Sequence, residues 1–363
     1  MISSARNLIL ILAMGFMFPR HGFAQVPPPL PFLKGVDVSS IPQYEATGIV
    51  FRNGQKPKPI LEIFRDHGAN AVRLRLFVHP NGRGEAVNDL PYTIRLAQEA
   101  RKLHFLILLD LHYSDTWADP GHQVIPAAWK NLTLPDLVDQ VRTYTVQTVK
   151  AFADAGATPD LVQVGNEINN GLLHPLGGFD DPSVPADTAF DRIAALLGAG
   201  IDGVRQAAPQ ARIVIHAANG ERTERVRHFF DELAHRHVAF DIVGLSYYPT
   251  RGTLSQIAVT LNSVAAAYRK PVLIVETACP WRSSPGRTSE PSLAWPPTPE
   301  GQKQYLLDLT KTLHDVPNGL GAGFFYWHPD AVRAGSLPFW QRGDMALFDS
   351  SDNALPALDA FEN

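Results

Sequence analysis

Eight short runs of apolar and β-branched residues recur along this chain of 363 residues, and segments with helical spacing separate them. Such runs, bounded by Pro and Gly, are typical of strands covered on both faces, as in a parallel sheet. Strand and helix alternating eight times favours a single closed α/β barrel, the (β/α)8 or TIM barrel, over an open doubly wound sheet. The predicted strands are residues 35–39, 71–77, 105–111, 161–164, 212–216, 242–246, 272–276 and 321–327.

The segments between these strands place apolar residues three or four positions apart, which predicts amphipathic helices. In residues 134–155, for example, Leu134, Val138 and Val141 fall on one face, and Gly156 follows as a signal for a helix end. No stretch has the composition of a linker, so residues 35–363 are predicted to form one catalytic barrel. The predicted helices are residues 59–67, 134–155, 189–208, 222–236, 254–269 and 299–314.

The N-terminal segment differs from the rest of the chain. Arg6 precedes the apolar run 8–18, and the small residue Ala24 lies where a signal peptidase would cut, so residues 1–24 resemble a secretory signal peptide. The proline-rich residues 25–34 are then expected to form an exposed leader. We therefore expect an exported protein, found in the periplasm or the medium. The alternative is an apolar N-terminal helix that stays attached.

Composition excludes several classes of partner. Charged residues make up 19% of the chain and the net charge is −4, so no basic face for nucleic acid is expected. After the N-terminal segment, no apolar stretch reaches the roughly 18 residues that a membrane span needs. The single cysteine, Cys279, permits no internal disulfide and is expected to be a small buried side chain. We expect a monomer without a cofactor.

Two glutamates close predicted buried strands. Glu167 follows the run 161–164 after Gly165 and Asn166, and Glu276 ends the run 272–276. A carboxylate at the end of a buried strand is costly unless it is paired or used in chemistry. Since the carboxyl ends of barrel strands surround one active-site face, these two could act together, as paired carboxylates do in cleaving a glycosidic bond. The alternative is two unrelated ion pairs.

Other polar and aromatic residues also end predicted strands. Taken singly, each has a structural explanation, such as an ion pair for Arg75 or a backbone carbonyl partner for a buried histidine. Their convergence on one rim favours a binding cleft, in which Trp327 is suited to stack on a sugar ring. These residues are Asp37, Ser39, Ser40, Arg73, Arg75, Asp110, His112, Tyr113, Ser114, Asp115, Asn166, His216, Asn219, Tyr247, Tyr248, Tyr326, Trp327 and His328.

The motifs at these strand ends resemble those of glycoside hydrolase family 53, the endo-β-1,4-galactanases that cut arabinogalactan side chains. The similarity extends from about Gly35 to Phe361, and the block from His112 to Pro120 is its most specific part. It implies a (β/α)8 glycosidase that cleaves β-1,4-galactan with retention of configuration and without a cofactor. The similar stretches are residues 35–40, 72–75, 110–120, 164–168, 275–277, 325–327 and 345–355.

The resemblance also implies residue roles. Glu167 would be the general acid/base and Glu276 the nucleophile of a double displacement, roughly 5 Å apart. Arg73 and Tyr248 would hold the nucleophile, and Asn166 would bond the sugar 2-hydroxyl. The substrate-binding residues implied in this way are Arg73, His112, Trp117, Asp119, Asn166, His216, Tyr248 and Trp327.

Three positions depart from the family pattern. The family often has Trp at His174, Tyr at Cys279 and Glu at His328, so altered subsites are expected and the preferred chain length and linkage stay open. Residues 277–300 contain only Glu290 and Glu300 as acids. Because calcium takes roughly six to eight oxygen ligands, we predict no metal at that loop.

Three alternatives compete with this interpretation. One is another retaining enzyme of the same clan, of the mannanase or cellulase type. Another is a metal-dependent barrel hydrolase that uses Asp110, His112 and His216, although these residues lack a tight ligand spacing. The third is a catalytically inactive carbohydrate-binding protein, which the presence of both glutamates disfavours.

Overall fold

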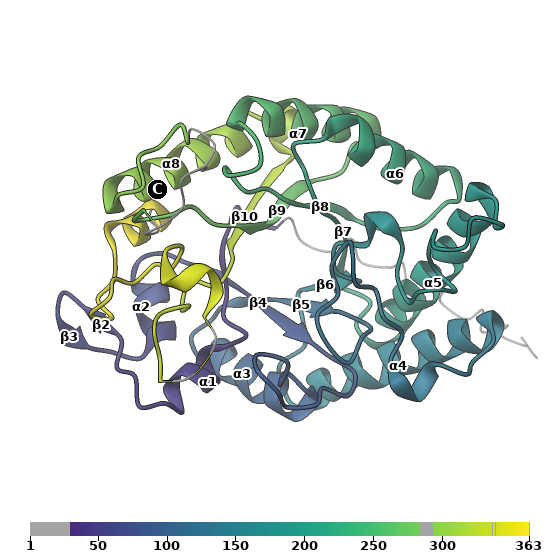
Figure 1. The fold of residues 1–363 in the computed structure, drawn as a ribbon, viewed down its shortest axis with the longest axis horizontal. Helices are drawn as coiled ribbons and strands as arrows, with labels where there is room; N and C mark the ends of the chain where they lie inside the picture. Colours follow the sequence, from purple (N-terminus) through teal and green to yellow (C-terminus); the bar gives the residue numbers. More distant parts are fainter. Residues whose placement is uncertain (1–29, 284–292, 336, 338, 363) are drawn as a thin grey trace, which may run out of the picture.

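The computed structural model describes residues 30–283, 293–335, 337 and 339–362. Its parallel strands form one closed barrel in the order β1-β10-β9-β8-β7-β6-β5-β4 (Figure 1). The predicted (β/α)8 barrel is therefore confirmed. The barrel strands are β1 (Leu33–Asp37), β4 (Ala71–Leu76), β5 (Leu106–Leu111), β6 (Leu161–Val164), β7 (Arg212–Ala217), β8 (Ile242–Ser246), β9 (Val272–Thr277) and β10 (Gly321–Tyr326). A small hairpin of β2 (Arg52–Asn53) and β3 (Lys56–Pro57) lies outside the barrel.

The first strand begins earlier than predicted. Leu33 and Lys34 pair with Gly323 and Phe324 of β10, so these two residues belong to the barrel and not to the leader. The apolar side chain of Leu33 is fully buried, which explains why the strand extends to it. The predicted signal peptide and residues 25–29 of the predicted leader lie outside the described residues.

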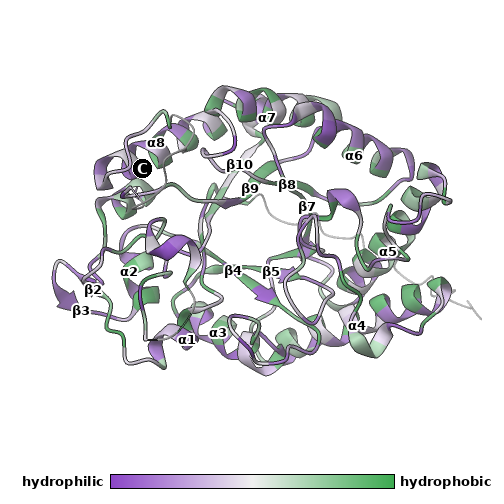
Figure 2. Ribbon diagram, in the orientation of Figure 1, coloured by the Kyte–Doolittle hydropathy of each residue, from purple (hydrophilic) through white to green (hydrophobic). Residues whose placement is uncertain are grey.

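Every helix predicted from the sequence is present. The helices are α2 (Ile60–Asp66), α4 (Leu134–Asp154), α5 (Ala186–Ala207), α6 (Thr223–His235), α7 (Leu254–Tyr268) and α8 (Pro299–His314), together with the unpredicted α1 (Ile41–Glu45) and α3 (Leu90–Lys102). Short 3-10 helices are η1 (Ala127–Trp129), η2 (Ile168–Asn170), η3 (Pro317–Gly319), η4 (Trp340–Gly343) and η5 (Pro356–Phe361). The helices surround the barrel, and hydrophobic and hydrophilic residues alternate along them (Figure 2).

Helix α3 escaped prediction because its buried face is small. It buries Leu96 together with Ala97 and Ala100, which give a weak apolar period. Its start is nevertheless marked, since the Asp89 side chain accepts a hydrogen bond from the Tyr92 amide. Within the described residues, no helix combines the length and the apolar character needed to cross a membrane.

The barrel interior is apolar at one end and polar at the other. Phe325 fills its centre so closely that a Cβ on Gly35 would lie 2.2 Å from the phenyl ring. Toward the carboxyl ends of the strands the inward side chains become polar and charged, and there they form the floor of a cleft. The apolar cluster is Leu33, Ala71, Leu108, Leu161, Val214, Ile242, Leu273, Val275 and Phe325, each no more than 1% exposed.

Candidate active site

A cleft of about 640 Å³ lies at the carboxyl ends of the strands and brings both predicted catalytic glutamates together. Its lining includes five of the predicted substrate-binding residues, namely Trp117, Asp119, Asn166, Tyr248 and Trp327. The other predicted binding residues, Arg73, His112 and His216, lie beneath that surface and are fully or almost fully buried. The complete lining is Glu85, Trp117, Ala118, Asp119, Asn166, Glu167, Tyr248, Thr250, Arg251, Glu276, Trp327, His328, Trp340, Gln341 and Met345.

A sharp backbone turn aims Glu167 into the cleft. Gly165 has φ 85°, and Glu167 itself is left-handed with φ 49° and ψ 47°. A Cβ on Gly165 would lie 2.7 Å from the Ile168 side chain, so only glycine fits there. A non-glycine residue held in this conformation costs roughly 1–3 kcal/mol and is often found at a functional site.

A bulge in β9 aims the second carboxylate. Leu245 of β8 pairs with Ile274, but the next residue, Ser246, pairs with Glu276, so Val275 is the extra residue. Both Leu273 and Val275 point into the apolar barrel core. Strict alternation would then turn Glu276 outward, toward the helices; the bulge turns it into the cleft instead.

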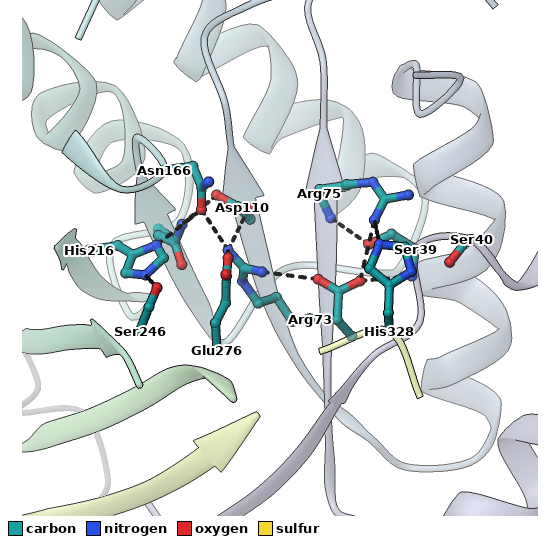
Figure 3. Close-up of polar contacts among 12 residues, drawn as sticks. Ser39, Ser40, Arg73, Arg75, Asp110, Asn166, His216, Ser246, Glu276 and His328 are labelled. Atoms are coloured by element: carbon teal, nitrogen blue, oxygen red, sulfur yellow. Dashed lines mark hydrogen bonds and ion pairs between the residues drawn. The ribbon is translucent and has the colours of Figure 1, made fainter. Parts of the chain in front are cut away.

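Glu276 has two partners that favour its ionised form. Its Oε1 lies 2.9 Å from Arg73 Nη2, and its Oε2 accepts a hydrogen bond of 3.1 Å from the Tyr248 hydroxyl. Arg73 is fully buried and is fixed by Asp37 at 3.1 Å and Asp110 at 2.8 Å (Figure 3). This network holds a cation directly against one of the two carboxylates.

Glu167 is held by a neutral chain of hydrogen bonds. Ser246 Oγ donates to Glu167 Oε1 at 2.6 Å and lies 2.8 Å from His216 Nε2. Burial, reinforced by the charge of Arg73, lowers the pKa of His216 well below its ordinary value, so the ring is neutral. His216 Nδ1 lies 3.3 Å from the Glu167 amide nitrogen, which can only donate, and 3.0 Å from Asn166 Oδ1, which can only accept, so the tautomer of the ring decides which of these two hydrogen bonds forms. Ser246 bonds Oε1 of Glu167, so a proton on this carboxyl group would be carried by Oε2.

The electrostatics of the two carboxyls differ accordingly. Burial raises the pKa of Glu167 and of Glu276, while Arg73 opposes the rise at Glu276 and the nearby Glu167 adds to it. Since the two groups repel each other when both are charged, one of them ionises first. Glu276 takes that charge, because it contacts a guanidinium and a phenol, whereas Glu167 contacts a serine.

The loop that follows β5 is anchored to the floor of the cleft. His112 lies 3.0 Å from Asp110 and accepts a hydrogen bond of 3.1 Å from the Ala118 amide. Asn166 donates to the Ala118 carbonyl at 2.7 Å, and its Oδ1 accepts from Arg73 at 2.8 Å and lies 3.0 Å from His216 Nδ1. These contacts fix the loop and so place Trp117 and Asp119 at the rim.

An aromatic wall borders the floor. The rings of Trp117 and Trp327 meet edge to face at 5.9 Å, and the Arg73 guanidinium lies 5.3 Å from the Trp327 ring centre. The Arg75 guanidinium lies 4.3 Å from the centre of the Trp117 ring. Cations beneath fix these rings and leave a wall suited to the apolar face of a sugar.

The geometry gives little support to a metal centre. Asp110 already contacts the Arg73 cation at 2.8 Å, which disfavours a second cation. Among the described residues, the one group of three or more possible metal ligands found is His67, Asp359 and Glu362, which lies outside this cleft. The predicted lack of calcium at residues 277–300 stays a prediction, because part of that loop lies outside the described residues.

The three departures from the family pattern differ in their surroundings. His328 lines the cleft, as a subsite residue would. His174 pairs with Asp180 at 2.6 Å and is not part of the cleft lining. Cys279 is fully buried, as expected for a lone thiol, and the altered subsite expected from the loss of the family's Tyr at this position stays a prediction.

Sequence reasoning missed several lining or supporting residues. Ser246 ends a strand that the sequence did predict, and that position was the signal that could have found it. Glu85 and Arg251 come from loops and Trp340 begins the short 3-10 helix η4, where no hydrophobic period marks the direction of a side chain. Only the folded arrangement brings them to the cleft.

Comparison with known proteins decides the family. The model of Glycosyl hydrolase family 53 matches residues 33–361. The chain belongs to this family. It is therefore a glycosidase, and the resemblance noted in its motifs is confirmed.

Relatives of this family-53 enzyme match it over most of their length. Arabinogalactan endo-β-1,4-galactanase A of Emericella nidulans is 34% identical over 311 residues, covering 82% of this chain and 85% of the relative. The family 53 catalytic domain from Ignisphaera aggregans superposes with a TM-score of 0.83 at 31% identity, covering 93% of this chain and 98% of that domain. A fungal β-1,4-galactanase gives 0.82 at 30% identity, with coverages of 92% and 100%.

Proposed function

We propose that this enzyme cleaves β-1,4-galactosidic bonds within galactan or arabinogalactan chains, by double displacement with retention. The relatives named as arabinogalactan endo-β-1,4-galactanases support the substrate. The observation that carries the mechanism is the unequal environment of the two carboxyls. Glu276 contacts Arg73 and Tyr248, whereas the side-chain hydrogen bond found for Glu167 among the described residues comes from the neutral Ser246 hydroxyl.

In the first step, Glu276 attacks the anomeric carbon while the glycosidic C–O bond breaks. The proton on Glu167 Oε2 passes to the departing oxygen, so the leaving chain departs as a neutral alcohol. The product is a galactosyl ester of Glu276. Arg73 and Tyr248, which stabilise the charged carboxylate beforehand, keep the attacking oxygen oriented.

In the second step, Glu167 acts as a base. Esterification removes the negative charge of Glu276, so the pKa of Glu167 falls and its carboxylate can take a proton from water. The hydroxide equivalent attacks the anomeric carbon, the ester bond breaks, and Glu276 regains its charge. Two inversions give net retention, which requires the carboxyls to lie roughly 5 Å apart.

The architecture of the cleft also supports attack within a chain. Trp117 and Trp327 form an aromatic wall, and Asp119, Arg251 and Trp340 also line the cleft. A polymer needs such contacts beyond the sugar at the cleavage point.

The first test is release of reducing sugar from linear β-1,4-galactan by the wild type and by Glu167→Ala and Glu276→Ala. Activity is expected to fall by orders of magnitude in both variants. NMR of the first product should give the β-anomer. A folded wild type that is inactive on galactan but active on mannan or cellulose would replace this substrate with that of another clan member.

Azide separates the two catalytic roles on a substrate with an activated aryl leaving group. With Glu276→Ala, azide takes the place of the nucleophile and yields an α-galactosyl azide after a single inversion. With Glu167→Ala, azide intercepts the galactosyl ester and yields the β-azide. The opposite pattern would exchange the two assignments.

We also propose that the enzyme is exported by cleavage of residues 1–24. The basis is the arrangement of Arg6, the apolar run 8–18 and Ala24. N-terminal sequencing of protein recovered from an expressing culture should begin at Gln25. A mature protein that retains residues 1–24 would contradict export by this route.

A further inference from the structure

One carboxylate in the cleft takes no part in the mechanism above. Glu85 lies in the loop after β4 and lines the cleft with its side chain 17% exposed. Within the described part of the chain, its carboxylate receives no hydrogen bond, and its nearest ion-pair contact is His328 Nε2 at 3.9 Å. A half-buried carboxylate without donors costs stability, because water no longer solvates it fully.

Two neighbouring groups share this incomplete bonding. Arg75 is fully buried; its Nε donates to Asn88 at 3.1 Å, its Nη1 lies 3.5 Å from His328 Nε2, and its Nη2 has no hydrogen-bond partner among the described residues. His328 Nδ1 is likewise unpartnered within the same residues. Because Nη1 can only donate, Nε2 accepts and Nδ1 carries the hydrogen. One acceptor and two donors therefore lie close together.

Aromatic surface adjoins this polar group. The imidazole of His328 stacks with the indole of Trp340 at 6.1 Å and 25° between planes, and Trp117 lies 6.2 Å away on another side. Trp340 also lines the cleft. A sugar ring has one apolar face and an edge of hydroxyls that both donate and accept, and this combination of ring surface and polar groups matches it.

The positions of Arg75 and His328 relative to the two glutamates indicate which part of the substrate they face. Figure 3 shows His328 and Arg75 on one side of the Arg73–Glu276 pair and His216 and Ser246 on the other. Ser246 holds Glu167, the proposed acid, which must face the leaving part of the substrate. The side with His328 therefore faces the sugars that stay bound to the nucleophile.

We propose that Glu85, with His328 and Trp340, forms a subsite for a neutral sugar on the non-reducing side of the cleaved bond. This rests on the proposed function. Glu85 accepts hydrogen bonds from two neighbouring hydroxyls, and Trp340 covers the ring. The negative charge of Glu85 makes a uronic acid a poor occupant, because its carboxylate would be repelled.

The test compares two aryl substrates, an aryl β-galactoside and an aryl β-1,4-galactobioside. Only the second places a sugar in the proposed subsite. In Glu85→Gln, the ratio of kcat/KM for the galactobioside to that for the monogalactoside should fall about tenfold or more, the usual worth of a hydrogen bond to a charged group. Glu99→Gln, at an exposed position of α3, is the matched control and should leave the ratio unchanged.

The outcomes distinguish the two proposals. A wild type that hydrolyses the galactobioside, with the same ratio in Glu85→Gln, overturns the subsite and leaves the galactanase proposal standing. Equal losses on both substrates also overturn it, since Glu85 would then act through the shape of the whole cleft. A folded wild type inactive on both substrates and on galactan overturns the proposed function, and the subsite with it.

Discussion

The two ends of the barrel interior obey opposite rules. From the amino ends of the strands to the barrel centre, nine apolar side chains, Leu33 and Phe325 among them, fill the core and carry no charge. At the carboxyl ends, Asp37, Arg73 and Asp110 form a buried ionic network that reaches Glu276. Burying apolar surface stabilises a fold, whereas burying charges often fails to recover the cost of removing them from water. The contrast indicates that one end supports the fold and the other sacrifices stability for chemistry.

The largest expected effect is on activity and comes from Glu276→Ala. Removing the nucleophile should lower kcat on galactan by a factor of at least about a thousand, as loss of a catalytic group does in other enzymes. The temperature of unfolding, followed by circular dichroism, should stay the same or rise, because one buried carboxyl is gone. A large fall in that temperature would mean that the polar end stabilises the fold, contrary to the contrast drawn above.

The next effect is on stability and comes from the opposite end, with Leu161→Ala. Truncating this fully buried side chain should cost about 2–5 kcal/mol in the free energy of unfolding. Urea denaturation measures this cost. The fraction that stays folded should keep the wild-type KM, and a changed KM would mean that the apolar end also shapes the cleft.

A smaller effect is expected from Tyr248→Phe. The lost hydroxyl no longer stabilises ionised Glu276, so the pKa of Glu276 rises and the acidic limb of the kcat/KM profile moves to higher pH. At the optimum, kcat/KM should fall roughly tenfold. Tyr268→Phe removes a hydroxyl that contacts Asp231 away from the cleft and serves as the control. If the acidic limb stayed at the same pH, the Tyr248 hydroxyl would not be stabilising ionised Glu276.

The smallest effect is expected from Ser246→Ala. The Ser246 hydrogen bond lowers the pKa of Glu167, so its loss raises that pKa. Because Glu167 must be protonated to act as the acid, the basic limb of the kcat profile should move to higher pH. Ser255→Ala, exposed on α7, controls for the loss of a hydroxyl. A shift to lower pH would contradict the proposed chain from His216 to Glu167.

The apolar and polar ends of the barrel also differ in how much of each could be predicted from the sequence. The strands were found because a buried parallel strand is a continuous apolar run, and β8 matches its predicted bounds, Ile242 and Ser246. Glu167 and Glu276 were found because each stands at the end of such a run. Helix α3 was missed because alanines form much of its buried face.

The parts of the cleft that escaped prediction depend on more than one segment. Glu85 reaches it from a loop and Trp340 from the short 3-10 helix η4, and the barrel beneath sets the paths of both segments. The bulge at Val275 is a matter of register among three strands, which one strand's sequence does not contain.

Through that bulge, one residue, Val275, sets the position of the Glu276 carboxylate. The reach and direction of Glu276 depend on how many residues lie between Leu273 and Thr277, and hardly on which apolar residue stands at position 275. Substitution there is a question of volume, whereas deletion of Val275 would remove the bulge and place Glu276 in the inward position that Val275 now occupies, nearer the apolar core. In evolution, this strand should tolerate substitution at position 275 better than a change in its length.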